Sequence, residues 1–130
     1  MKKTFFSAAI AAILAITLAA CSTPGAKQIV LNTASGENPA LTVGQRANIV
    51  GDLDLSGTEV KEFTILVEEK APGGDWTEFR NIKARQGSTS VGFALVKNEP
   101  GDYKYRATLS GEGYGPFVSA ELTITYKAKK

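Results

Sequence analysis

The feature that most constrains the fold is a repeated alternation of apolar and polar residues between residues 28 and 127. In the segment 102–109, every second side chain is apolar: Tyr103, Tyr105, Ala107 and Leu109. A period of two is that of a β-strand with one buried and one solvated face, and no window in this region keeps a helical period. The sequence therefore predicts an all-β fold of seven or eight short strands, packed as two antiparallel sheets.

Clusters of Gly, Pro, Asn and Asp mark the turns between these strands. The expected strands cover residues 28–32, 40–43, 46–55, 62–69, 76–83, 89–96, 102–109 and 118–127. The Gly- and Pro-containing run 111–116 predicts the last loop. In the closing strand, five residues are expected to face inward: Val118, Ala120, Leu122, Ile124 and Tyr126.

The N-terminal segment has the layout of a helical secretory signal. Residues 1–3 are a basic start, residues 5–20 carry no charge, and small residues lead into Cys21. The ending Leu18-Ala19-Ala20-Cys21 resembles the lipobox of bacterial lipoproteins, in which the signal is cleaved before a cysteine that carries lipid. An uncleaved membrane helix and secretion without lipid are the less favoured alternatives, because the apolar run is short and ends in small residues.

The resemblance implies cleavage between Ala20 and Cys21, with fatty acyl chains on Cys21. The expected organisation is a signal peptide over 1–20, a lipidated tether over 21–27, a sandwich domain over 28–127 and a basic tail over 128–130. In the family's sorting rule an aspartate after the cysteine retains lipoproteins at the inner membrane. Ser22 stands there, so an extracytoplasmic, lipid-anchored location is implied, at the outer membrane if the cell has two.

Composition excludes several classes of function. The chain has 15 basic and 13 acidic residues, and Lys2 and Lys3 would leave with the signal, so the basicity does not predict nucleic-acid binding. With no histidine, the chain cannot form a Ser-His or Cys-His nucleophile pair or use the commonest zinc ligand. With one cysteine, it cannot form an internal disulfide. We expect no cofactor and no metal.

The segment Pro100-Gly101-Asp102-Tyr103-Lys104-Tyr105-Arg106-Ala107 resembles the sixth strand of bacterial immunoglobulin-like and fibronectin-type domains. The turn and tryptophan of Gly73-Gly74-Asp75-Trp76 and the opening Leu41-Thr42-Val43-Gly44-Gln45 are also similar to that family. The resemblance implies an Ig-like sandwich in which the Tyr103 hydroxyl bonds back to the preceding turn. Trp76 and Phe79 are candidates for stacking against a sugar or peptide, but for Trp76 packing over the core is the favoured interpretation. The chain departs from the antibody-like pattern in lacking both core cysteines.

Few residues are candidates for chemistry. Asp52 and Asp54 on one strand face could hold calcium, but a solvated face is the favoured interpretation. The acid pairs Glu68-Glu69 and Asp75-Glu78 would need a cleft to act in glycoside hydrolysis. A candidate binding loop comprises Tyr114, Gly113 and Gly115, where nothing obvious would bury the aromatic ring.

The leading hypothesis is a non-enzymatic lipoprotein, anchored to the membrane through Cys21, whose Ig-like domain binds an envelope protein or polysaccharide. The alternative is a structural spacer or an assembly subunit of a secreted or cell-surface complex. A small hydrolase is a third, weaker possibility.

Overall fold

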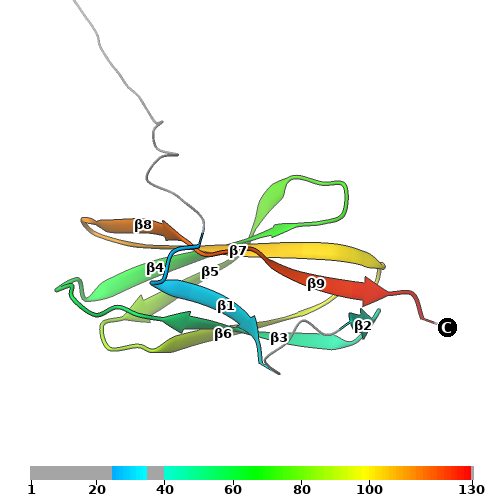
Figure 1. Cartoon of the computed structure of the whole chain (residues 1–130), viewed down its shortest axis with the longest axis horizontal. Helices are drawn as coiled ribbons and strands as arrows, with labels where there is room; N and C mark the ends of the chain where they lie inside the picture. The colour runs from blue at the N-terminus through cyan, green and yellow to red at the C-terminus, as the bar shows by residue number, and fades with distance from the viewer. Residues whose placement is uncertain (1–24, 35–39, 130) are drawn as a thin grey trace, which may run out of the picture.

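The computed structural model describes residues 25–34 and 40–129, which contain nine β-strands and no helix (Figure 1). In chain order the strands are β1 (Ile29–Thr33), β2 (Ala40–Thr42), β3 (Arg46–Leu53), β4 (Glu62–Lys70), β5 (Trp76–Arg85), β6 (Ser90–Val96), β7 (Gly101–Gly111), β8 (Tyr114–Val118) and β9 (Leu122–Lys127). The predicted all-β sandwich is confirmed, with nine strands instead of seven or eight. The expected signal helix lies outside the described residues. Within the described ranges, no helix could cross a membrane.

The strands form two sheets, which Figure 1 shows as an upper layer with β7, β8 and β9 and a lower layer with β1, β3 and β6. The small sheet has the order β1-β3-β6, and the large sheet has the order β2-β9-β7-β4-β5, with β8 also paired to β7. Neighbouring strands are antiparallel except β2, which pairs in parallel with β9. Thus β1, β8 and β9 lie on one side of the sandwich, and β5 and β6 on the other.

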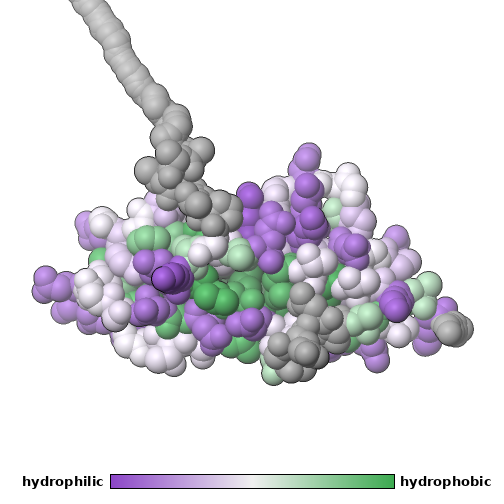
Figure 2. Space-filling view, in the orientation of Figure 1, coloured by the Kyte–Doolittle hydropathy of each residue, from purple (hydrophilic) through white to green (hydrophobic). Residues whose placement is uncertain are grey.

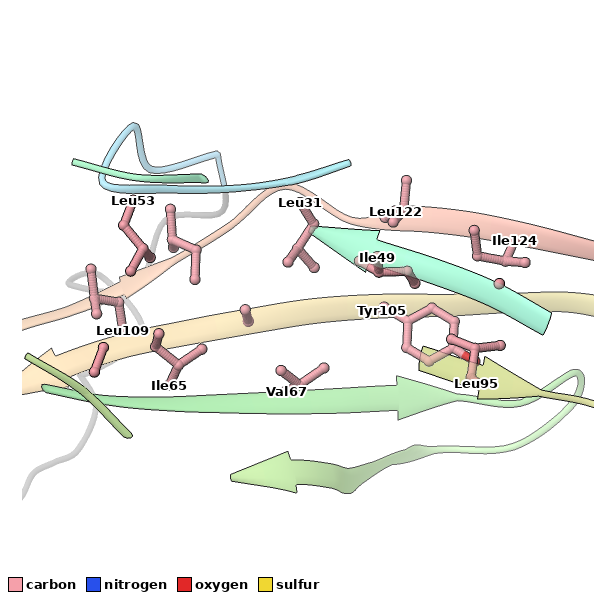
Figure 3. Packing of buried hydrophobic residues seen from close by; sticks show 14 of the residues in the cluster. Leu31, Ile49, Leu53, Ile65, Val67, Leu95, Tyr105, Leu109, Leu122 and Ile124 are labelled. Atoms are coloured by element: carbon pink, nitrogen blue, oxygen red, sulfur yellow. The ribbon is translucent and has the colours of Figure 1, made fainter. Parts of the chain in front are cut away.

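The alternation of the sequence fills the space between the sheets with apolar side chains. Figure 3 shows Leu31, Ile49, Leu53 and Leu95 of the small sheet opposite residues of the large one: Ile65, Val67, Tyr105, Leu109, Leu122 and Ile124. Each buried side chain of this kind stabilises the fold by about 1.5–3 kcal/mol. On the face drawn in Figure 2, apolar side chains gather between the layers and hydrophilic ones surround them.

The Tyr103 hydroxyl donates a hydrogen bond to the Glu99 carbonyl oxygen at 2.9 Å, so the predicted tyrosine corner is present. The expected last loop is wrong in extent, because only Glu112 and Gly113 form the turn and Tyr114 already begins β8. The run of glycines and a proline conceals a strand that pairs with the end of β7.

The expected closing strand over 118–127 is also interrupted. Val118 pairs with Thr108, whereas Leu122 pairs with Tyr105, so this strand carries one more residue than its partner between the two pairs. One extra residue reverses the faces of a strand. As a result Ser119 is buried and Ala120, expected in the core, is exposed.

Trp76 does not cover the core, contrary to the prediction. It pairs with Lys70 on the solvent face of the large sheet, where the Arg106 guanidinium lies 4.2 Å from the centre of its ring. A register shift after Val67 leaves Phe79 as an extra residue in β5. Phe79 takes the core-covering place, with its ring centre 5.5 Å from that of Tyr105.

Candidate functional site

The predicted binding loop is a packed hairpin. The Tyr114 ring is half-buried and makes edge-on contacts with Phe63 and Phe117, with ring centres 5.3 and 4.9 Å away. Burial raises the pKa of the Tyr114 hydroxyl, and the negative charge of Asp54 adds to the shift. The Tyr114 ring therefore packs mainly against Phe63 and Phe117, and part of it remains exposed to solvent.

The two glycines of this hairpin have backbone roles. Gly113 has φ of +69° and Gly115 has φ of +80°, a region that favours glycine. A side chain at Gly113 would enter open space, whereas a Cβ at Gly115 would lie 2.7 Å from the Leu109 carbonyl oxygen. The positive φ of both residues, and the close approach at Gly115, account for the two glycines without a ligand.

Beside the hairpin lies an open cleft of about 1300 Å³ between the β3–β4 loop, the start of β4, the end of β5 and the β7–β8 turn. Charged side chains of both signs line it: Glu59, Lys61, Glu62, Lys83, Arg85 and Glu112. The Lys83 ammonium donates to the Thr64 hydroxyl at 3.0 Å. Such a lining offers hydrogen bonds to a polar ligand but selects no single charge. No local sequence pattern predicts the cleft, because its walls come from three separate segments of the chain.

The aspartates of the β3 region do not converge on a common point. Asp54 accepts hydrogen bonds from the backbone N–H and hydroxyl of Ser56, at 3.1 and 2.6 Å, and these bonds lower its pKa. Asp52 accepts from the Asn32 amide at 3.1 Å. Within the part of the chain that the structure describes, no group of three or more His, Cys, Asp or Glu side chains could hold a metal ion.

The adjacent acids of β4 point to opposite faces of the large sheet. Glu68 faces solvent and pairs with Arg106 at 2.8 Å. Glu69 faces the interior, where it accepts from the Tyr105 hydroxyl at 2.6 Å and pairs with Lys97 at 2.5 Å. Burial and the Glu69 carboxylate raise the pKa of Tyr105 strongly. The two carboxylates therefore face opposite sides of the sheet, and each is engaged by structural partners.

A cluster of cations and aromatic rings closes the opposite side, between β5 and β6. The Phe79 ring has the Arg80 guanidinium 4.2 Å and the Lys97 ammonium 5.3 Å from its centre. Its edge also contacts Phe93 of β6, with ring centres 6.0 Å apart. Arg80 continues to the small sheet, where it donates to the Ala94 carbonyl oxygen at 3.3 Å. The sequence pattern does not predict this cluster, because the register shift in β5 creates it.

The predicted lipidation residue Cys21 and its neighbour Ala20 lie outside the described residues. The described chain begins close to them, at Gly25, and the Ala26 N–H donates to the Val118 carbonyl oxygen at 3.0 Å. The N-terminal segment thus joins the sandwich where β8 ends, on the side away from β5 and β6.

No protein-family model matches the sequence, and neither does any curated protein. Among solved structures, the CARDB domain of the PF1109 protein from Pyrococcus furiosus, determined in complex with di-metal ions, has a TM-score of 0.57 and 16% identity; the match covers 82% of this chain and 96% of that one. A conjugative transposon lipoprotein from Bacteroides eggerthii has a TM-score of 0.50 and 11% identity, over 75% and 97% of the two chains. A variant of the superoxide reductase (neelaredoxin) from Ignicoccus hospitalis also scores 0.50 at 11% identity, over 77% and 82%. At these identities the likeness concerns the fold alone.

Proposed function

We propose that this chain is a non-catalytic lipoprotein of the cell envelope, which holds its Ig-like sandwich at a membrane through lipid on Cys21 and binds an envelope protein or polysaccharide. The observation that carries the non-catalytic part is the engagement of the candidate acids: Asp54, Glu68 and Glu69 each hold a structural partner. The lipobox-like sequence at Ala20-Cys21 supports the anchor.

The point at which the chain enters the sandwich gives the anchored domain an orientation. Gly25 follows Cys21 by four residues, which span at most about 14 Å. The side with β8 and β9 would therefore face the membrane. In the large sheet β5 lies beyond β7 and β4, and at about 4.8 Å per strand its edge would be roughly 15 Å farther out. A partner would then meet the β5 and β6 side first.

Metabolic labelling with an alkyne fatty acid tests the anchor. We expect label on the wild-type protein and on Ser22→Ala, its matched control, and none on Cys21→Ser. The reason is that lipid would be attached to the Cys21 sulfur through a thioether and to the amino group that cleavage frees. Label that persists in Cys21→Ser would refute the anchor.

A photo-reactive residue tests the binding role in living cells. Placed at Glu78 of β5 it should capture a partner, whereas at Ala120, exposed between β8 and β9, it should not. Capture at Ala120 alone would contradict the orientation. A stable oligomer of this chain, with no other partner at Glu78, would favour the alternative of an assembly subunit.

A further inference from the structure

The outer edge of β6 is an open side of the small sheet. Within the described ranges β6 pairs only with β3. The carbonyl oxygens of Thr89 and Lys97, just outside its ends, accept from the segment around β3, at 2.9 and 2.8 Å. Because backbone groups alternate in direction along a strand, four residues turn their N–H and C=O groups to the open edge: Ser90, Gly92, Ala94 and Val96.

This edge lacks the features with which proteins usually protect edge strands. Between Gln86 and Val96 there is no charged residue and no proline, and the Val96 side chain is 50% exposed. The neighbouring edge strand β5 differs, since it carries a bulge at Phe79 and four charged residues. The edge strand β1 is also uncharged but is shorter and lies on the side where the N-terminal segment enters.

One cation of β5 lies beside the β6 edge. Arg80 pairs with Val67 on the inner side of the large sheet, whereas Glu78, Lys83 and Arg85 lie on its solvent face. Arg80 is exposed and already reaches the edge, through its 3.3 Å hydrogen bond to the Ala94 carbonyl oxygen. An incoming strand would compete for that oxygen with its own N–H group, and the guanidinium would then need a new acceptor. A carboxylate is the partner that a guanidinium binds most strongly.

We propose that the open edge of β6 accepts an extended, acidic segment of a partner protein as a fourth strand of the small sheet, with a carboxylate of that segment bound to Arg80. Main-chain hydrogen bonds would supply affinity, and Arg80 would select the charge. A second copy of this chain fits less well, because its own β6 carries no carboxylate that could bind Arg80. This inference rests on the proposed binding function and names the partner's chemistry.

The test uses the full chain in detergent and two synthetic heptapeptides, Thr-Glu-Val-Glu-Val-Glu-Thr and the same peptide with lysine in place of glutamate. Hydrogen exchange at the edge amides of Gly92, Ala94 and Val96 is followed by NMR. We expect the acidic peptide to slow exchange at these amides at least tenfold and the basic peptide to leave it unchanged.

Two variants and one control sharpen the result. Gly92→Pro removes an edge N–H that β3 does not use and should abolish protection. Arg80→Glu leaves every backbone N–H of β6 in place and should abolish protection by the acidic peptide. Lys104→Glu, on the solvent face of β7, is the matched charge reversal and should bind as wild type.

The proposal is overturned if neither peptide protects the edge, if both protect it equally, or if Arg80→Glu keeps its protection by the acidic peptide. Edge amides that become protected with rising protein concentration and no peptide would instead identify a second copy as the occupant. Fatty-acid labelling is a separate readout, so loss of peptide binding in a labelled protein refutes this inference and leaves the anchor standing.

Discussion

Replacing Ser119 by alanine should destabilise the domain more than its size suggests. Ser119 is fully buried where β8 gives way to β9. Its N–H donates to the Ala107 carbonyl oxygen at 2.8 Å, and its hydroxyl accepts from the Ala107 N–H at 2.9 Å. The hydroxyl thus stands in for a backbone carbonyl that the extra residue has displaced. In Ser119→Ala the buried Ala107 N–H loses its acceptor, which costs about 1–3 kcal/mol.

Urea unfolding of the wild type and the variant measures this cost. With a dependence on urea of about 1–3 kcal/mol per molar, a loss of 2 kcal/mol moves the midpoint down by roughly 1 M. Ser90→Ala, an exposed serine of β6, is the matched control and should move it little. The Ala107 amide should also exchange its hydrogen faster in Ser119→Ala. Equal midpoints for the two variants would refute the role assigned to the Ser119 hydroxyl.

Two further perturbations test the hairpin and the buried phenol. Gly113→Ala should lower the free energy of unfolding by about 1–2 kcal/mol, because alanine is strained at this positive φ. Gly115→Ala should lower it further, because its Cβ would also lie 2.7 Å from a carbonyl oxygen of β7. Equal urea midpoints for the two variants would contradict this difference. Because its pKa is raised, the Tyr105 hydroxyl stays protonated in the folded state above about pH 10, where the same hydroxyl ionises in the unfolded chain. The stability that the buried neutral phenol contributes is therefore fully present below about pH 10 and is lost as the pH rises above it. Midpoints measured from pH 8 to 11 should fall less steeply for Tyr105→Phe, and parallel slopes would exclude this contribution.

The strands with strict alternation were predictable from the sequence, because a strand with one buried face has an apolar side chain at every second residue. In β7, Tyr103 and Tyr105 are both buried, as predicted. The same rule failed after Val118, because a single extra residue reverses the faces and has no signature in composition. The bulge requires a polar side chain at Ser119, because the Ala107 N–H needs an acceptor there. In the sequence, however, Ser119 resembles any outward-facing serine of a strand.

The candidate site was harder to predict, because it depends on contacts between distant segments. Trp76 was assigned to the core from its position after a turn, yet the register shift in β5 gives that place to Phe79. The same shift brings Arg80 to the edge of β6, in the other sheet. Pairing registers of this kind are set by packing across the sandwich, and no local pattern encodes them.

The parallel pairing of β2 with β9 bears on when the domain can fold. It joins residues 40–42 to residues 125–127, so β2 cannot pair until the last strand of the sandwich is present. A nascent chain that lacks residues 122–127 can pair β1 with β3, but it leaves β2 unpaired and half of β7 without its neighbour. Bringing such distant segments together costs chain entropy before their packing can stabilise the fold. We therefore expect a folding time of about milliseconds to seconds, as in other proteins dominated by long-range strand pairs. The chain can therefore complete its large sheet only when its last strand is present.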